Sequence, residues 1–380
     1  MNRWRQLLAS SAVTSFISSL MAIVVGLAAG FIVMLISNSS QAVRAFWVIL
    51  SSGVADMRNI GQVLYFATPI IMTGLAVGFA SRTGLFNIGA SGQFTVGAFL
   101  AILVSIRSLA LPGPLPWILG LSAATLGGAL WGLIPGVLKA WRNVNEVIAG
   151  IMTNYIGMYL VNFLITRTVY DRLRNQTLRV PPRGTIPKMG FEHIFRVGNS
   201  VSSVNGGIVI AAVTAILLYI LLEKTTFGYE LKACGLNRDA ARYAGINENR
   251  SIILSMMISG ALAGLGGGLL YLAGAGKSLD VVDVLAPEGF NGIPVALLGM
   301  NSPLGIVLAG LFIAYLTVGG FNMQLFRFAP QVIEIITAVI IYFSAFALLF
   351  KNFLEGRLVP GRLLEREEEG EPTAERGGGS

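Results

Sequence analysis

The chain contains apolar runs long enough to cross a lipid bilayer, and they recur along almost its whole length. The first, from Ser11 to Ser37, has no charged residue, and similar runs follow as far as Phe350. A helix needs about 20 apolar residues to cross the hydrocarbon core of a bilayer. Hydrophobic residues make up 54% of the chain and charged residues only 12%, whereas soluble domains carry roughly 25% charged residues. We therefore expect an all-α, polytopic membrane helix bundle.

About ten transmembrane spans are predicted, of which one, at 285–300, is short and contains Pro287 and Pro294. We expect this span to be a broken or re-entrant helix, which is tolerated only where protein or a cavity surrounds it. Residues 1–354 then form the transmembrane domain, and the charged tail 355–380 is expected to be disordered and cytoplasmic. The predicted spans are 12–36, 62–80, 86–106, 115–138, 146–166, 207–223, 251–273, 285–300, 303–320 and 330–350.

The distribution of Lys and Arg favours both termini on the cytoplasmic side. In that orientation the cytoplasmic segments hold fifteen of these residues, and the short outer loops hold five. Cytoplasmic loops of membrane proteins carry such an excess, although long translocated loops escape the rule in part. The long outer loop 167–206 is an exception of this kind, since it holds seven. The net charge of +8 is thus explained without a nucleic-acid partner.

The chain lacks the residues that a metal centre or a membrane-embedded enzyme would need. Cys234 is the only cysteine and His193 the only histidine, which excludes an internal disulfide and a site rich in Cys or His. A string resembling a phosphate-binding loop ends at Lys277–Ser278, but the required first glycine is Tyr271 and no strand precedes it. We expect no cofactor, no metal and no enzymatic activity. If transport needs ATP, another subunit must bind it.

Polar residues inside the apolar spans are the candidates for contact with a solute. Such groups usually face the bundle interior or a water-filled path, because an unsatisfied polar group in hydrocarbon is costly. Their amides, hydroxyl and carboxylates suit an uncharged polar solute, and Tyr155 and Phe290 could stack on a flat ring. Interhelical hydrogen bonding and core packing are the alternatives for each. The candidates are Asn87, Gln93, Asn145, Glu146, Asn154, Tyr155, Asn162, Phe290, Asn291 and Glu334.

The loop 224–250 is the second region of interest. Asn237 can cap a helix that starts at Arg238, and Gly245 can end it, which predicts a helix of about two turns between two spans. Its small residues fit close docking into a groove on another protein, with an amphipathic interfacial helix as the alternative. The residues expected to carry the docking are Gly235, Asn237, Ala240, Ala241, Arg242, Tyr243 and Gly245.

Three strings resemble a known family. They are GLFNIGASGQF from Gly84, GLNRDAARYAGIN from Gly235 and GFNGIPVALLG from Gly289. Their order and spacing, over about residues 60–350, are similar to the permease subunits of bacterial ABC importers of the branched-chain amino acid, ribose and nucleoside type. The string NEVIAGIMTNYI from Asn145 resembles the nucleoside permeases most.

The resemblance implies the partners and the location. It implies a multi-pass protein of the bacterial cytoplasmic (inner) membrane, paired with a second, shorter permease as a heterodimer. It further implies a cytoplasmic ATP-binding subunit, an extracytoplasmic substrate-binding protein and membrane lipid as the surrounding medium. The loop 224–250 then corresponds to the coupling helix that docks on the ATPase.

The sequence also departs from that family. Nucleoside permeases commonly have an acid where this chain has Ser91, Asp where it has Asn291, and a smaller residue at Pro294. Two other hypotheses therefore stay open. The first keeps the architecture with a simple sugar or a branched-chain amino acid as cargo. The second is an ion-coupled secondary transporter, which would need intramembrane ionisable residues.

Overall fold

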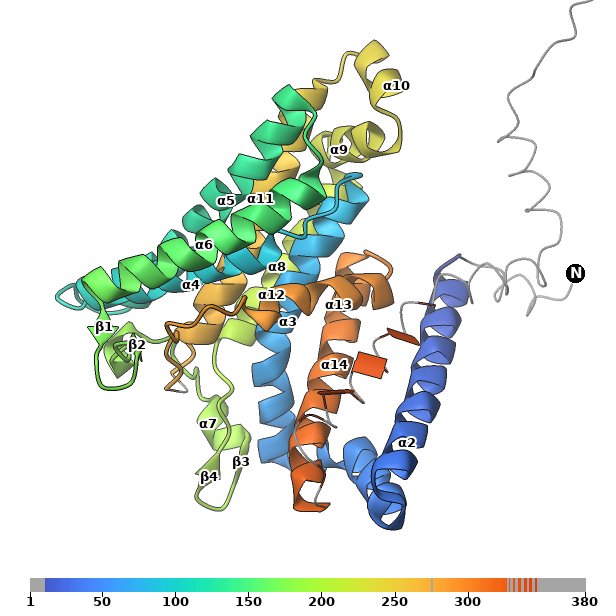
Figure 1. Cartoon of the computed structure of the whole chain (residues 1–380), viewed down its shortest axis with the longest axis vertical. Helices are drawn as coiled ribbons and strands as arrows, with labels where there is room; N and C mark the ends of the chain where they lie inside the picture. The colour runs from blue at the N-terminus through green and yellow to red at the C-terminus, as the bar shows by residue number, and fades with distance from the viewer. Residues whose placement is uncertain are drawn as a thin grey trace, which may run out of the picture.

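The chain folds into a bundle of long helices with two small hairpins at one end (Figure 1). The computed structural model describes residues 11–274, 276–326, 328, 331, 334–335, 338–339, 342–343 and 346. The long helices are α2 (Ser11–Ser52), α3 (Met57–Arg82), α4 (Ala90–Arg107), α5 (Leu115–Arg142), α6 (Glu146–Thr168), α8 (Gly207–Lys224), α11 (Glu248–Tyr271) and α14 (Pro303–Met323).

Short elements connect these helices. The helical ones are η1 (Pro182–Gly184), α7 (Phe191–Ile194), α9 (Thr226–Leu236), α10 (Arg238–Tyr243), α12 (Pro287–Phe290), α13 (Gly292–Leu298) and η2 (Gln324–Phe326). The strands are β1 (Tyr170–Asp171), β2 (Gln176–Thr177), β3 (Arg196–Val197) and β4 (Ser200–Val201), which pair as two antiparallel hairpins.

The prediction of a multi-pass, all-α membrane bundle is confirmed. Within the described residues, eight helices are long and apolar enough to cross a membrane. They correspond to eight of the ten predicted spans. The predicted span 285–300 is broken into α12 and α13, as its prolines and glycines suggested. The predicted span 330–350 lies for the most part outside the described residues.

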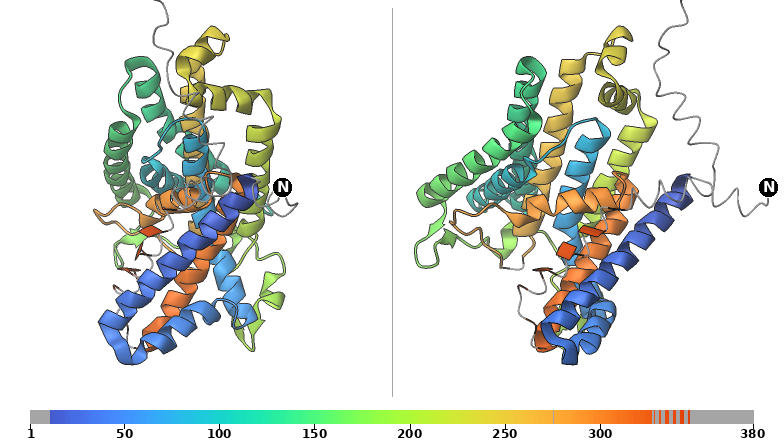
Figure 2. Two further views of the ribbon diagram at one scale, coloured as in Figure 1. Left: turned by 90° about the vertical axis from the view of Figure 1, so that its right-hand side faces the viewer. Right: turned by 45° about the vertical axis from the view of Figure 1, so that its right-hand side comes forward.

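Helix α2 extends further than the sequence indicated. It was expected to end near residue 36, but after a kink at Asn38 (φ −155°, ψ 86°) the chain stays helical to Ser52. The second segment is amphipathic, with Ala42, Ala45 and Ile49 buried and Trp47 69% exposed. It was predicted to be part of an outer loop, since it lies between the predicted spans 12–36 and 62–80. Figure 2 shows α2 lying along α14, which it contacts.

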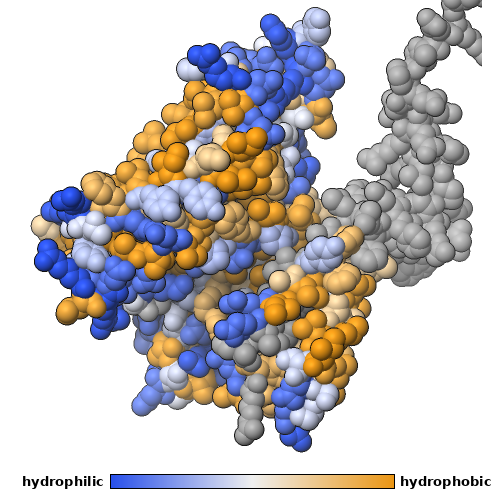
Figure 3. Space-filling model, viewed as in Figure 1, coloured by the Kyte–Doolittle hydropathy of each residue, from blue (hydrophilic) through white to orange (hydrophobic). Residues whose placement is uncertain are grey.

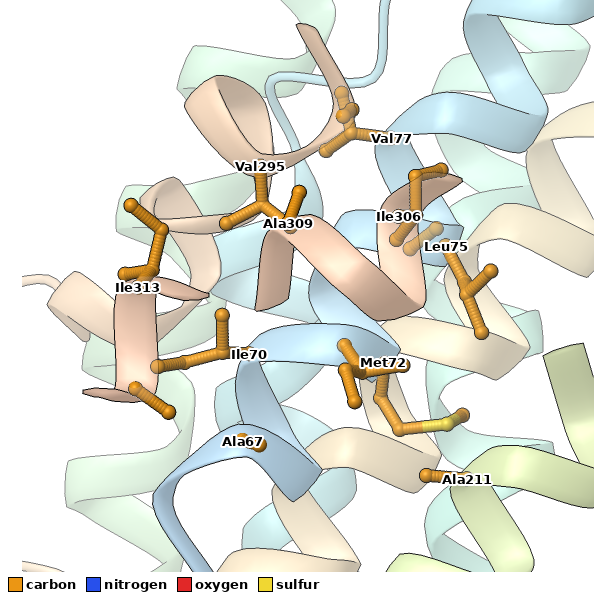
Figure 4. Close-up of a cluster of buried hydrophobic side chains, with 14 of the residues drawn as sticks. Ala67, Ile70, Met72, Leu75, Val77, Ala211, Val295, Ile306, Ala309 and Ile313 are labelled. Atoms are coloured by element: carbon orange, nitrogen blue, oxygen red, sulfur yellow. The ribbon is translucent and has the colours of Figure 1, made fainter. Parts of the chain in front are cut away.

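The most buried of the long helices are α3, α4 and α11. The side chains of α3 pack against α13 and α14, as Figure 4 shows for Ile70, Leu75 and their neighbours Val295 and Ile306. Helix α11 packs against α5 and α4 on its other side. The exposed apolar side chains lie over the middle of the bundle, and hydrophilic residues gather at the α10 end and around β1 and β2 (Figure 3). This distribution is typical of a membrane protein.

Glycines let α5 and α11 approach each other at backbone distance. A Cβ at Gly128 would lie 2.8 Å from the Cα of Gly264, and a Cβ at Gly264 would lie 2.8 Å from the Cα of Gly128. Gly260, four residues before Gly264 in α11, also contacts Gly128. Such contacts replace the hydrophobic effect, which does not drive helices together in lipid. The glycine pair at 260 and 264 therefore serves helix packing.

The loop 167–206 is folded. Its first hairpin, β1–β2, is tied to the segment after α11, because the backbone N–H of Thr177 donates to the carbonyl of Leu279 at 2.9 Å. The side chain of Asn175 donates to the carbonyl of Val281 at 2.9 Å. Both hairpins lie at the end of the bundle away from α9 and α10 (Figure 1). We refer to these two ends as the hairpin end and the coupling-loop end.

The α5–α11 contact yields a test of the packing. Replacing Gly128 by Val should lower the stability of the purified chain by about 1–3 kcal/mol, because the new side chain overlaps the backbone of α11. Thermal unfolding in detergent measures the loss. The control is Leu126→Val on the exposed face of α5, where Leu126 is 64% exposed. Equal melting temperatures for the two variants would contradict the packing described here.

Candidate translocation path and coupling loop

The broken segment, which consists of α12 and α13, packs against α3 and the start of α4. Gly289, in α12, lies directly against Ser91 at the start of α4, where a Cβ would come within 2.6 Å of the backbone nitrogen of Ser91. The Ser91 hydroxyl donates to the carbonyl of Ala286 at 2.8 Å. Gly292, which opens α13, lies against the backbone of Thr73 in α3. The break therefore has fixed neighbours on both sides.

A fully buried polar network lies beside it. The Asn87 amide donates to the Gln93 carbonyl oxygen and to the Ser259 hydroxyl, both at 2.7 Å, and Gln93 donates back to Asn87 at 3.2 Å. Ser259 donates onward to the carbonyl of Ala76 at 2.6 Å. All three polar side chains are 0% exposed. The network joins the turn before α4 to α3 and α11.

Asn154 forms hydrogen bonds with the backbone at the start of α4 and in the turn before it. Its side-chain oxygen accepts a hydrogen bond from the N–H of Gly92 at 2.7 Å, and its amide donates to the carbonyl of Ile88 at 2.9 Å. The side chain is 1% exposed. It therefore satisfies backbone groups at the start of α4, which has no side-chain cap of its own.

The other predicted path residues lie in different surroundings. Asn145 caps α6, accepting from the N–H of Val147 at 2.8 Å, and Glu146 pairs with Lys139 at 2.9 Å. Both lie at the α5–α6 turn, at the coupling-loop end (Figure 1). Tyr155 is 48% exposed on the outer face of α6.

Phe290 and Asn291 sit at the break itself. Phe290 is half-buried and Asn291 is exposed. The structure thus brings Asn87, Gln93, Asn154 and the break together, and places Asn145, Glu146 and Tyr155 elsewhere.

The loop 224–250 contains the predicted two-turn helix. The Asn237 side chain accepts from the N–H of Ala240 at 3.0 Å, and Gly245 follows the helix with φ +83°. This confirms the predicted start and end. A second helix, α9, precedes it and was not predicted.

The loop exposes some of the predicted docking residues and buries one. Tyr243 is 94% exposed, and Ala240, Arg242 and Gly245 are exposed as well. Ala241 is only 4% exposed, since it faces the chain itself. A docking face on this loop therefore cannot include the Ala241 side chain.

Gly235 fixes the loop to the body of the bundle. A Cβ on this glycine would lie 2.5 Å from the carbonyl carbon of Thr83 and 2.6 Å from the nitrogen of Gly84. Its neighbour Cys234 is buried, and this burial raises the pKa of the thiol. Glu223 forms ion pairs with Lys232 at 2.9 Å and with Arg82 at 3.6 Å. The loop thus rests on the turn that leads to Asn87.

Sequence reasoning missed two members of these sites. Ser259 completes the amide network, but an isolated serine in an apolar helix carries no signal of its own. Glu288, near the break, pairs with Lys277 at 3.8 Å. A carboxylate inside an apolar segment is itself a signal, because it needs a partner there.

Comparison with known proteins agrees with this architecture. Residues 59–345 match the family described as the permease component of the branched-chain amino acid transport system. The chain belongs to this permease family. It is a multi-pass transport component, and its relatives are transport subunits of ABC systems.

Three relatives cover most of the chain. The guanosine ABC transporter permease protein NupP of Bacillus subtilis (strain 168) is 38% identical, over 89% of this chain and 95% of its own. The nucleoside ABC transporter permease protein NupB of Lactococcus lactis subsp. cremoris (strain MG1363) is 34% identical, over 88% and 92%. The glucose ABC transporter permease protein TsgB13 of Haloferax volcanii is 32% identical, over 85% and 86%. No solved structure matches the chain.

The amide network yields a second test. Gln93→Met keeps the side-chain volume but leaves the Asn87 oxygen without its donor, which should lower the stability of this permease by about 1–3 kcal/mol. Thermal unfolding in detergent measures it, with Ser122→Ala on the exposed face of α5 as the control. A variant with wild-type stability and impaired transport would contradict the structural role and indicate contact with the solute.

Proposed function

We propose that the chain is the permease of an ATP-driven ABC importer and forms the translocation path for nucleosides. The observation that supports the substrate most is the 38% identity to a guanosine permease over 95% of that protein. The chemistry of the bundle is compatible with it, because the polar groups at the break are amides and hydroxyls rather than a cluster of like charges. Such groups bind an uncharged polar solute.

The proposed path runs past the break between α12 and α13. Phe290 and Asn291 would touch the solute there, since both side chains are at least partly accessible. Asn87, Gln93 and Asn154 would hold the wall of the path, because their hydrogen-bonding groups are already engaged within the chain. Asn145 and Glu146 would lie near its cytoplasmic mouth.

The proposed transmission from ATPase to path follows contacts within the chain. Gly235 fixes the α9–α10 loop to the turn at Gly84, and this turn leads to Asn87 and its partners. From there the start of α4 contacts the break through Ser91 and Gly289. Displacement of the loop by the ATPase would therefore shift the break as a connected unit. Contiguous contacts are a physical rationale for such coupling, and measured coupling must establish it.

The proposed docking face on the ATPase consists of the exposed side chains of the α9–α10 loop. Tyr243 is its most exposed large residue, and Leu236, at the end of α9, is 88% exposed. Large exposed apolar and aromatic residues mark interaction sites when they gather on a soluble surface. This assignment places the loop and both termini in the cytoplasm, and the two hairpins outside.

The remaining proposed partners are a second permease and an extracytoplasmic substrate-binding protein. Bacillus subtilis (strain 168) has a second guanosine ABC transporter permease protein, NupQ, which is 29% identical to this chain over 281 residues. Two permeases of one substrate class in one organism support a heterodimer. The proposed location is the bacterial inner membrane.

Transport by reconstituted vesicles tests the function. The chain, its second permease and the ATPase are placed in liposomes, and the binding protein is added outside. We expect uptake of labelled guanosine that requires ATP and stops with vanadate. Uptake that follows an ion gradient without ATP would contradict the proposal in favour of a secondary transporter.

A sugar cargo is the second candidate, favoured by the 32% identity to a glucose permease. Competition separates the two candidates in the same vesicles. Excess unlabelled inosine or adenosine should suppress guanosine uptake, whereas excess glucose or ribose should leave it unchanged. Suppression by a sugar but not by inosine or adenosine would favour a sugar as the cargo.

Docking on the ATPase predicts a residue-specific effect. Tyr243→Glu should reduce guanosine uptake at least about tenfold, because it places a charge in a contact with the ATPase that excludes water. The loss of binding free energy at such a contact exceeds about 1.4 kcal/mol, which corresponds to a factor of ten. The protein should still reach the membrane, since the side chain is 94% exposed. The control is Tyr159→Phe on the exposed face of α6, which lies outside the docking face and is 56% exposed. Full uptake by the Tyr243 variant would refute docking through this side chain.

A further inference from the structure

A pocket opens at the hairpin end, between the loop 167–206 and the end of α11. Its volume is about 400 Å³, and pockets that bind small groups range from about 300 to 1,000 Å³. One wall comes from residues between 179 and 192 of the loop, and the other from Tyr271 and the segment that follows it. In the orientation proposed above, the pocket lies on the outer side of the membrane.

Hydrogen bonds hold the two walls together. The backbone N–H of Ile186 donates to the carbonyl of Leu272 at 2.8 Å, and the side-chain amide of Asn205 donates to the carbonyl of Ala273 at 3.1 Å. Leu272 and Ala273 directly follow α11, and both are buried. The pocket is therefore formed without a partner, and a preformed site loses less conformational entropy when it binds.

The lining carries an excess of positive charge. Arg179, Lys188 and Lys277 contribute three exposed cations, and Glu192 contributes one carboxylate. Within the described part of the chain, Arg179 and Lys188 form no ion pair, and Lys277 forms a long one of 3.8 Å with Glu288. Cations that share a pocket repel one another, so an anion among them is favourable.

The loop as a whole has the same bias. It holds seven Lys and Arg residues but only two acidic ones, Asp171 and Glu192. Outer segments of membrane proteins usually carry fewer basic residues than inner ones. A positive surface of this kind attracts a partner with negative charge and suppresses partners of like charge.

The position of the pocket favours a protein as this partner. Helix α11 packs against α3, α4 and α5, so protein surrounds the end of α11, whereas lipid head groups meet the rim of a bundle. The solute proposed above is uncharged and gains little from three cations. The binding protein is the proposed soluble partner on the outer side, and Asp and Glu carboxylates pair well with guanidinium and ammonium groups.

We propose that Arg179, Lys188 and Lys277 form a docking site for an acidic side chain of the extracytoplasmic binding protein. The three cations donate charge-assisted hydrogen bonds to its carboxylate. The site adjoins the break, because Lys277 pairs with Glu288 of α12, so a binding protein seated here releases its solute beside α12. The proposal rests on the ABC function proposed above and specifies where this partner docks.

The concentration dependence of uptake tests the site. Vesicles with the complete transporter take up guanosine at increasing concentrations of loaded binding protein. The double variant Arg179→Glu/Lys188→Glu should raise the half-saturating concentration at least about tenfold, because it sets like charges against each other. The maximal rate should stay within about twofold, since both side chains are exposed and lie away from the break. A lower maximal rate at an unchanged half-saturating concentration would overturn the inference.

The control makes the same charge change outside the pocket. Arg172 and Arg174 are exposed in the turn between β1 and β2 and do not line the pocket. Arg172→Glu/Arg174→Glu should raise the half-saturating concentration less than about threefold, because it weakens only the long-range attraction. A rise equal to that of the pocket variant would show that net charge alone attracts the binding protein, and would contradict the site.

Cross-linking of the unaltered protein identifies what enters the pocket. The chain has six lysines, of which Lys188 and Lys277 are the two in the segments proposed to lie outside. A carbodiimide activates a carboxylate, an adjacent lysine amine attacks it and loses a proton, and an amide forms as the reagent leaves as a urea. Mass spectrometry should find Lys188 or Lys277 joined to Asp or Glu of the binding protein. Absence of such peptides from a formed complex would overturn the inference.

Lipid composition separates a docking protein from a lipid head group. The pocket variant and the wild type are compared in vesicles of phosphatidylcholine, with and without phosphatidylglycerol. The difference between them should be the same in both, and a difference seen only with the anionic lipid would assign the pocket to head groups and refute docking. If wild-type vesicles take up no guanosine at all, the proposed cargo fails, and the cross-link still decides the docking site.

Discussion

The structure depends on close contact between backbones at a few glycines. In lipid, apolar side chains gain little from leaving their surroundings, so helices are held by packing and by hydrogen bonds between them. Gly128 and Gly264 hold α5 on α11, and Gly235 holds the coupling loop on the turn at Gly84. Gly289 lets α12 lie against the start of α4. Any side chain at these positions would push apart the elements that these contacts hold together.

These contacts explain how polar groups are tolerated in the interior. Because α3, α11 and the turn before α4 lie so close, Asn87, Gln93 and Ser259 can satisfy one another without water. A closed network of this kind is rigid, since breaking any bond leaves a buried polar group unpaired. By contrast, Asn291, which separates α12 from α13 next to this network, is exposed. A rigid wall beside an accessible break suits a path that must move as a unit and still admit a solute.

Much of this architecture could be predicted from the sequence, because the length and polarity of apolar runs decide where helices cross a membrane. The two-turn helix after Asn237 followed from a cap and a terminal glycine. The segment after Asn38 and helix α9 were missed, since a charged residue or a short mixed sequence in a predicted loop conceals helical periodicity. The pairing of Asn87 with Ser259 joins residues 172 positions apart, and only tertiary structure places them together. For the same reason the sequence left open whether Asn87 contacts a solute or forms hydrogen bonds within the chain, and in the structure its amide is bonded within the chain.

The central claim is that this chain transports only as one part of an ATP-driven assembly. The most direct measurement is gentle native purification of the chain from its own membrane, followed by native mass spectrometry of what accompanies it. The account predicts a complex that contains this chain, a second permease and an ATP-binding subunit. A chain that arrives alone, and that still transports in vesicles with an ion gradient and no ATP, would contradict the account.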